Sequence, residues 1–307
     1  MEKTMPKISD IQMRDPFMVP DGENWYLFGS TDRDIWRAPG VGFDVYRSRR
    51  KPNEDFPPDE YEGPFPAFRP PAGFYSETNF WAPEVHRYRG AWYMFATFKP
   101  VTGRRGTAVL KSNSVDGPYT PWSEGPVTPP QWECLDGTFY TDSREQPWMI
   151  FCHEWTQTGD GEICALPLTP DLKAAAGEAR LLFRASETPW ASPLKVKDPG
   201  RYPAPEPFYV TDGPFLYTAK NGSLLLLWSS FGVAGNYCIG VASSVSSDLR
   251  GPWKQSDACL FEADGGHGMV FSTPAGRLFL TVHSPNKSPM ERPVFLEIFE
   301  KDGMLYR

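Results

Sequence analysis

Short runs of aliphatic and aromatic residues recur along the whole chain, separated by segments rich in glycine, proline and polar residues. Most runs follow a turn that contains glycine or asparagine, which is the pattern of strands joined by tight turns. The clearest runs are residues 25–29, 92–98, 148–153, 224–229 and 277–283. Helical periodicity is scarce, and its best example is the short alanine-rich segment 171–182. The pattern therefore predicts an all-β chain.

A short acidic or histidine-bearing motif precedes each of these runs, which indicates five related units. In chain order the motifs are Arg14-Asp15-Pro16-Phe17, Trp81-Ala82-Pro83-Glu84, Leu135-Asp136-Gly137-Thr138-Phe139, Thr211-Asp212-Gly213-Pro214-Phe215 and Gly265-Gly266-His267-Gly268. Two segments, 114–119 and 247–253, also match each other, since both end in Gly-Pro-aromatic. We expect Asp15, Ala82, Asp136, Asp212 and His267 to hold the same position in successive units.

Five such units predict a five-bladed β-propeller, in which radial closure leaves short, protected edges around a central channel. The length of 307 residues fits a single domain over 1–307. Two polar segments, 47–76 and 190–202, show no strand pattern. We expect them to be long loops at the rim of a pocket.

Composition narrows the function. Glycine (27) and proline (33) suit many short strands joined by turns. The net charge of −7, with no basic cluster beyond the short run 47–51, argues against a nucleic-acid partner. An acidic chain in which 15% of residues are aromatic favours a neutral, hydroxyl-rich ligand instead. The five cysteines contain no CxxC pair, so we expect buried apolar residues and neither a disulfide framework nor a zinc site.

Location is only partly constrained. The longest apolar run, 224–228, is too short to span a bilayer, so no membrane partner is expected. Residues 1–10 lack the apolar stretch of a signal peptide. A cytoplasmic protein and the trimmed form of a periplasmic or secreted protein both fit, and the oligomeric state is left open.

Taken in order, the five motifs resemble those of glycoside hydrolase family 43 over about residues 10–300. The resemblance implies a five-bladed propeller that removes arabinofuranosyl, xylosyl or, in some branches, galactosyl units from plant glycans. We expect an exo-acting inverting enzyme with a carbohydrate substrate, either an α-L-arabinofuranosidase or a β-xylosidase.

The resemblance also implies roles for four residues. Asp15 matches the general base, and Asp136 matches the aspartate that orients the acid and tunes its pKa. Asp212 stands where the family has the general-acid glutamate of a Glu-Gly-Pro motif, so the carboxyl is one methylene shorter here. His267 matches a histidine that faces the channel and contacts a bound cation or its waters. A Ca²⁺ held mainly through water is the one cofactor that this suggests.

The chemistry of glycoside hydrolysis supports this set of carboxyl groups. An inverting enzyme needs two of them roughly 6.5–9.5 Å apart, with one ionised to activate water and the other protonated. A third carboxylate nearby raises the pKa of the acid. Aspartate before proline or glycine is also common in ordinary turns, so each motif alone is ambiguous. The shared position at the start of a unit favours function.

Further residues are candidates for contacts with the sugar. Trp81 and Phe139 can stack on an apolar sugar face. Glu84 can bind a hydroxyl or support the site, and Glu206 is the alternative acid if Asp212 is misplaced.

Two other functions stay open. A phosphorylase of the same fold would need a cationic cluster, for which the chain offers Arg14, Arg33, Arg37 and Arg292. A propeller that binds sugar without hydrolysis would account for the shortened acid.

Overall fold

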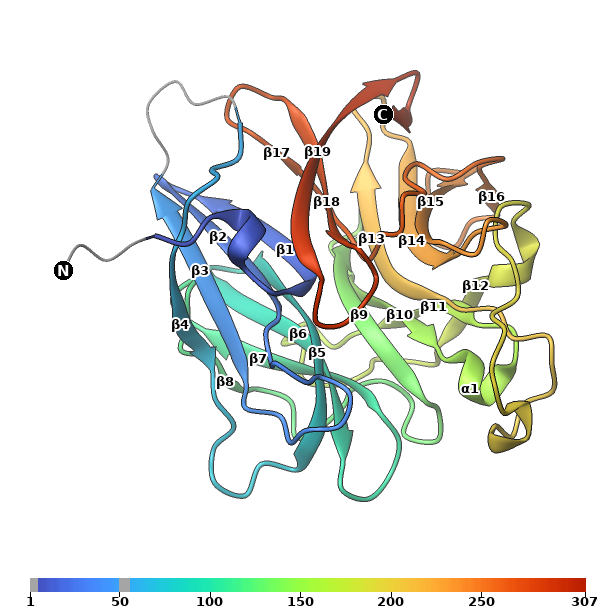
Figure 1. Cartoon of the computed structure of the whole chain (residues 1–307), viewed down its shortest axis with the longest axis horizontal. Coiled ribbons are helices and arrows are strands. Elements are labelled where there is room, and N and C mark those ends of the chain that lie inside the picture. Colours follow the sequence, from blue (N-terminus) through green and yellow to red (C-terminus); the bar gives the residue numbers. More distant parts are fainter. Residues whose placement is uncertain (1–4, 50–55) are drawn as a thin grey trace.

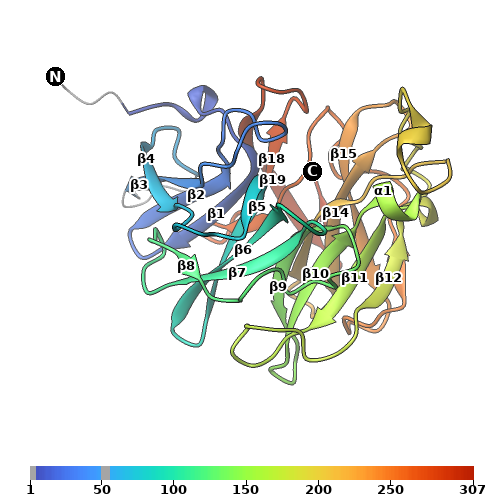
Figure 2. The same ribbon diagram turned by 90° about the horizontal axis from the view of Figure 1, so that it is seen from below.

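The computed structural model describes residues 5–49 and 56–307. Five sheets of four strands each are arranged radially, as Figures 1 and 2 show. The chain passes through them in order, and the colours of Figure 1 run around the molecule from blade one in blue to blade five in red. The predicted all-β five-bladed propeller is therefore confirmed.

Every blade consists of four consecutive antiparallel strands. Blade one contains β1 (Arg14–Asp21), β2 (Asn24–Ser30), β3 (Phe43–Arg49) and β4 (Glu62–Phe68). Blade two contains β5 (Ser76–Tyr88), β6 (Ala91–Pro100), β7 (Gly106–Ser112) and β8 (Thr120–Pro121). Blade three contains β9 (Cys134–Thr141), β10 (Pro147–His153), β11 (Glu162–Pro167) and β12 (Arg180–Arg184).

Blade four contains β13 (Asp212–Thr218), β14 (Leu224–Phe231), β15 (Tyr237–Ser244) and β16 (Trp253–Gln255). Blade five contains β17 (Val270–Ser272), β18 (Leu278–Ser284), β19 (Arg292–Lys301) and β20 (Met304–Tyr306). The short helices are η1 (Ile8–Asp10), α1 (Trp155–Thr158), η2 (Ala185–Glu187) and η3 (Pro199–Arg201). Across the described part of the chain, no helix combines the length and the apolar character needed to cross a membrane.

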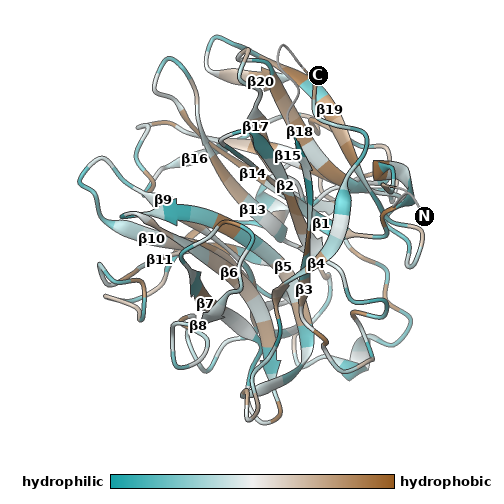
Figure 3. Cartoon of the chain, turned by 90° about the vertical axis from the view of Figure 1, so that its left-hand side faces the viewer, coloured by the Kyte–Doolittle hydropathy of each residue, from teal (hydrophilic) through white to brown (hydrophobic). Residues whose placement is uncertain are grey.

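The five apolar runs of the sequence fall on the second strands, β2, β6, β10, β14 and β18. These strands are packed between blades on both faces, and Trp25, Leu226 and Trp228 on them are fully buried. Burial on both faces explains why these strands are continuously apolar and do not alternate. Figure 3 shows apolar stretches running along the strands of the sheets. Four of the five cysteines are buried as well, one on each of β9, β10, β11 and β15.

Two predictions about local structure were wrong. The segment 47–76 includes β4, the outer strand of blade one, whose Pro64 and Pro66 are tolerated because it lies at a sheet edge. Residues 50–55 of that segment lie outside the described residues. The segment 171–182 is not helical, because Leu172 has a left-handed backbone (φ 63°) and the Asp171 carboxylate accepts the Lys173 N–H in a tight turn. The segment 190–202 has no strand, as expected.

The pairing of the first and second strands shifts by one residue near the pocket in each blade; in blade five the shift lies just before β17, after the isolated bridge Gly266↔His283. We call this irregularity the bulge. At each bulge one residue has a left-handed backbone, with φ between 46° and 57°, and we call these the bulge residues: Asp15, Ala82, Asp136, Gly213 and His267. The structure corrects the expected alignment in blade four. There the bulge residue is Gly213, while Asp212 pairs with Ser229 just as Arg14 pairs with Ser30. A Cβ at Gly213 would come within 2.6 Å of the His267 ring, so only glycine fits.

The backbone N–H of every bulge residue donates a hydrogen bond to the preceding blade. In three blades the acceptor is a hydroxyl: Ala82 donates to Ser30, Asp136 to Thr97 and His267 to Ser229, each at 2.8 Å. Asp15 donates to His283 Nδ1 at 3.3 Å, which closes the circle between blades one and five. In blade three the equivalent second-strand residue is Cys152, and the Gly213 N–H donates instead to Asp136 Oδ2 at 3.1 Å. We call these five bonds the bulge ring.

Candidate active site

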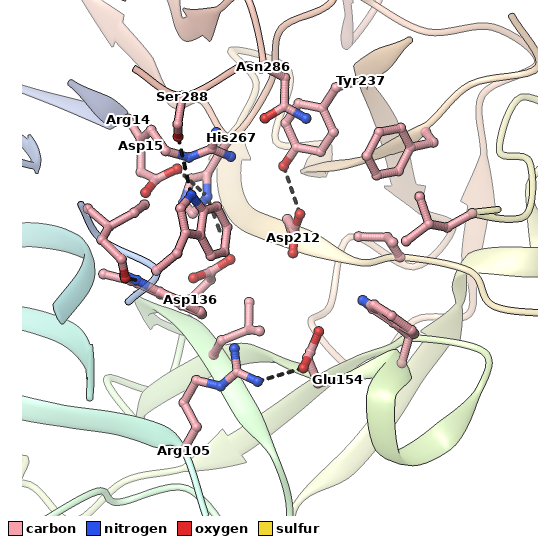
Figure 4. A pocket seen from close by; sticks show the side chains of 18 residues that line it. Arg14, Asp15, Arg105, Asp136, Glu154, Asp212, Tyr237, His267, Asn286 and Ser288 are labelled. Carbon is pink, nitrogen blue, oxygen red and sulfur yellow. Dashed lines mark hydrogen bonds and ion pairs between the residues drawn. The ribbon is translucent and has the colours of Figure 1, made fainter. Parts of the chain in front are cut away.

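A pocket of about 410 Å³ lies beside the bulge ring, and all five blades contribute to its lining. Asp15, Trp81, Asp136, Asp212 and His267 all face it, one from each blade. Figure 4 shows the polar side chains of this pocket turned toward one another. Five of the eight predicted site residues therefore meet in one place.

Asp15 is held as an anion. Its Oδ1 lies 3.1 Å from His267 Nδ1, and its Oδ2 accepts a 2.6 Å hydrogen bond from the Ser30 hydroxyl. Burial by itself would raise the pKa of Asp15, but the attraction and hydrogen bond of His267, with the charge of Arg14, hold that pKa well below its usual range. The surroundings of Asp15 therefore favour its ionised form.

His267 is the cation at the centre of the pocket. Its Nδ1 also lies 3.6 Å from Asp136 Oδ2, so two carboxylates share one imidazole nitrogen. Burial would lower the pKa of His267, but these carboxylates outweigh it and raise the pKa to about 10. The contact of His267 with a bound Ca²⁺ or its waters stays a prediction. The described residues include no group of three or more His, Cys, Asp or Glu side chains that could hold a metal.

His283 contacts the same aspartate but is neutral. It is fully buried, and burial together with the nearby Arg14 charge lowers its pKa to about 3. Its hydrogen bonds assign the tautomer, because Nδ1 accepts the Asp15 N–H while Nε2 faces Asn286 Oδ1 at 3.3 Å. Asp15 therefore contacts one charged histidine that lines the pocket, His267, and one neutral histidine that is buried outside the lining, His283.

Asp136 and Asp212 keep their protons to a higher pH than ordinary aspartates do, because their pKa values are raised to about 7 and about 6. Burial is the largest cause of the raised pKa of each, and His267 partly opposes it. Asp136 is raised further by the charges of Asp212 and Asp15, and Asp212 by the charge of Glu154. The Tyr237 hydroxyl donates to Asp212 Oδ2 at 3.0 Å and fixes its orientation. One ionised carboxylate and two carboxyls of raised pKa therefore face one pocket.

Glu154, which was not predicted from the sequence, lines the pocket directly after β10. This carboxylate is 6% exposed and accepts hydrogen bonds from Arg105 at 2.7 Å and from the Thr156 hydroxyl at 2.6 Å. Glu154 and Arg105 thus form an ion pair at the edge of the pocket. The available signal was an acidic residue at the end of a buried strand, next to His153.

One wall of the pocket consists of two adjacent indole rings flanked by two guanidinium groups. The Trp36 and Trp81 rings meet edge to face with centroids 5.1 Å apart. Arg105 lies over Trp81 at 4.8 Å, and Arg14 lies over Trp36 at 5.3 Å. The Trp81 indole donates to the Ile35 carbonyl at 2.7 Å, which ties this wall to the loop after β2. Trp81 was predicted to face the sugar, whereas Trp36 was missed.

Three predicted contacts lie elsewhere. Phe139 lines a second cavity, formed by residues further along the inner strands. Glu84 is buried away from the pocket, and its carboxylate binds His86 at 3.1 Å. Glu206 is exposed on the loop between η3 and β13 and does not line the pocket. The structure thus corrects the assignment of all three to the sugar site, and Glu206 is not placed to act as an acid.

The cationic cluster that a phosphorylase would need does not form. Arg14 faces the pocket but is paired with Glu291 at 2.9 Å. Arg292 donates to the carbonyls of Ser9, Pro289 and Glu291. Arg33 and Arg37 line a different groove, beyond Trp36. The four arginines are therefore dispersed among separate sites.

Known proteins share both this sequence pattern and this structure. The family model described as "Glycosyl hydrolases family 43" matches residues 7–305. A solved structure described as an endo-arabinase from Bacteroides thetaiotaomicron is 38% identical, covers 98% of this chain and 99% of its own, and superposes with a TM-score of 0.87. A solved endo-1,4-β-xylanase from the same species is 20% identical, covers 99% and 96% of the two chains, and shares the fold with a TM-score of 0.74.

One curated relative is the extracellular exo-α-(1→5)-L-arabinofuranosidase ArbA of Cellvibrio japonicus. It is 25% identical over 154 residues, which are 47% of this chain and 42% of that protein, so the match spans less than half of either. The family model, in contrast, matches nearly the whole propeller, including every blade that contributes to the pocket. The chain belongs to family 43 of the glycosyl hydrolases.

Proposed function

We propose that this glycoside hydrolase is an exo-acting, inverting α-L-arabinofuranosidase, with β-xylosidase as the second candidate. The names of two similar proteins, an endo-arabinase and an arabinofuranosidase, favour arabinose. The pocket of about 410 Å³ lies at the small end of the usual range for ligand sites, which favours a single sugar unit over a long open cleft.

The observation that carries the proposal is the contrast among the carboxyl groups. Asp15, whose pKa is held well below the usual range, suits a general base that takes a proton from water. Asp212, whose pKa is raised, suits an acid that protonates the departing glycosidic oxygen. The water oxygen then bonds to the anomeric carbon as the bond to the leaving oxygen breaks, which inverts the configuration.

The other charged groups act on these two. Asp136 accepts the N–H of Gly213, the residue next to Asp212, and so connects the base side of the pocket to the acid. Glu154, paired with Arg105, adds a negative charge that favours the proton on Asp212. The positive charge of His267 offsets the negative charge of Asp15 and Asp136 in the buried pocket. Any Ca²⁺ in the channel stays a prediction, and no step requires it.

The test is a panel of 4-nitrophenyl glycosides together with arabino- and xylo-oligosaccharides. We expect release of one sugar, with proton NMR showing the inverted anomer first. Release of single arabinose units from linear arabinan supports the exo mode, whereas oligosaccharides as first products would make the enzyme endo-acting. Binding of sugars without turnover of any glycoside would favour the non-hydrolytic propeller.

A further inference from the structure

A second groove, of about 640 Å³, adjoins the active-site pocket on the side of blades one and five. Trp36 and Ser288 line both the pocket and the groove. Trp36 Nε1 donates a hydrogen bond to Ser288 Oγ at 3.2 Å, so these two residues form a wall common to the pocket and the groove. The Trp36 side chain is 51% exposed, which is unusual for an indole and leaves ring surface free for a ligand.

The loop that forms this groove is held in place by its own acidic side chains. Asp34 Oδ1 accepts the N–H groups of Trp36 and Arg37, both at 3.1 Å. Asp32 Oδ2 accepts the Val41 N–H at 3.0 Å. The Trp36 ring is also packed against Trp81. The indole is therefore fixed before any ligand arrives, which lowers the entropic cost of binding.

The groove offers donors and acceptors in balance. Arg33 and Arg37 are exposed, and neither guanidinium has an ion pair or hydrogen bond to another of the described residues. Asp32 and Asp34 carry two negative charges beside these two positive ones. Guanidinium groups only donate and carboxylates only accept, so together they match hydroxyl groups, which do both. A charged ligand would be attracted by the residue pair of opposite charge and repelled by the pair of like charge.

We propose that this groove is a distal sugar-binding subsite for a neutral pentose or hexose unit next to the unit held in the pocket. One sugar face stacks on the free surface of Trp36, and its hydroxyls bind Arg33, Arg37 and the free oxygen of Asp34. The inference rests on the proposed glycosidase function, because both sites then contact one glycan chain. It makes the substrate an oligosaccharide of at least two units.

The experiment measures binding by calorimetry with the full chain carrying Asp15→Asn, so that turnover does not interfere. The probes are L-arabinose, α-1,5-L-arabino-oligosaccharides of two to five units, the matching xylose series, glucuronate and inorganic phosphate. The affinity for each probe is measured in the Asp15→Asn protein, which serves as the parent here. It is compared with the affinity of an Arg33→Ala/Arg37→Ala double variant and of an Arg144→Ala control, both made in that parent. Arg144 is an exposed arginine on a turn of blade three, outside both the pocket and the groove.

We expect oligosaccharides that reach the groove to bind roughly tenfold more tightly than the free monosaccharide, a typical contribution for a well-formed contact. The double variant should lose most of this gain yet bind the monosaccharide as the parent does, and the Arg144 control should match the parent throughout. The same affinity for all chain lengths, or no effect of the double variant, overturns the subsite.

Tight binding of glucuronate or phosphate that the double variant abolishes also overturns the proposal, because the groove would then be an anion site. A chain-length effect in a protein that hydrolyses no glycoside leaves the subsite standing while the proposed enzymatic function fails. No binding of any oligosaccharide overturns both.

Discussion

Replacing the charged histidine of the pocket by a neutral side chain should move the acidic limb of the pH–rate profile. In His267→Asn, the amide nitrogen can still donate where Nδ1 does, but the positive charge is gone. His267 Nδ1 lies 3.1 Å from Asp15 and 3.6 Å from Asp136. At an effective dielectric constant of ~20, each contact amounts to on the order of 5 kcal/mol.

One pKa unit corresponds to about 1.4 kcal/mol, so we expect the pKa of Asp15 to rise by at least about two units after relaxation. The acidic limb of kcat/KM, where the base becomes protonated, should then appear well above its position in the parent. The assay is kcat/KM for a 4-nitrophenyl glycoside between pH 3 and 9. Imidazole NMR gives an independent readout, because the His267 ring should stay protonated beyond pH 9.

His283→Asn is the matched control. His283 contacts Asp15 as well but is neutral, and the amide oxygen can accept the Asp15 N–H in place of Nδ1. This variant should leave the acidic limb where it was. Equal shifts in the two variants, or a His267 ring that titrates near pH 6.5, would refute the reasoning.

The same charge should affect stability. The pKa of His267 is higher in the folded state than in the unfolded chain. Its contribution to the free energy of unfolding is therefore fully present below the unfolded-state pKa of 6.5 and is lost as the pH rises toward about 10. Urea unfolding at several pH values should therefore show that the gap in unfolding free energy between the parent and His267→Asn narrows from pH 6 to pH 10. A constant gap would contradict this linkage.

Three further predictions concern the carboxyl groups. Asp15→Asn should lower kcat by at least ~10³-fold with an unchanged circular dichroism spectrum, and activity within tenfold of the parent would exclude it as the base. Asp212→Ala should reduce hydrolysis of oligosaccharides at least ~10-fold more than hydrolysis of nitrophenyl glycosides, whose leaving group needs little protonation, while the exposed Glu206→Ala should show no such difference. Glu154→Gln should lower the pKa of Asp212 and shift the alkaline limb of the pH–rate profile downward, because it removes a nearby negative charge; an unmoved limb would contradict the proposed tuning.

The repeating architecture could be predicted because each second strand is buried on both faces and leaves a continuous apolar run in the sequence. The equivalent positions at the start of each unit could also be predicted, because each carries a short motif. Their register could not be predicted, because in blade four the special backbone conformation falls on Gly213, and the aspartate precedes it. A one-residue offset cannot be read from composition when a glycine and an aspartate stand side by side.

Side-chain direction explains the contacts that were wrongly predicted. Glu84 and Phe139 belong to the right strands, but they lie beyond the bulges and face other parts of the protein. Glu154 and Trp36 belong to segments that carry no repeated motif, and only the folded loops bring them to the pocket. The sequence therefore predicted residues placed by the repeat and missed residues placed by individual loops.

The bulge ring has a consequence for how activity is lost. Blades one and five are each made of their own consecutive strands, so ion pairs, hydrogen bonds and packing close the circle at that seam, without a shared sheet. Asp15 lies on one side of the seam, and His267 and His283 lie on the other. A slight parting of these two blades would separate the anion from its cation before any sheet had melted. Activity should therefore be lost at a lower temperature than secondary structure. The enzymatic rate would then report whether blades one and five remain in contact.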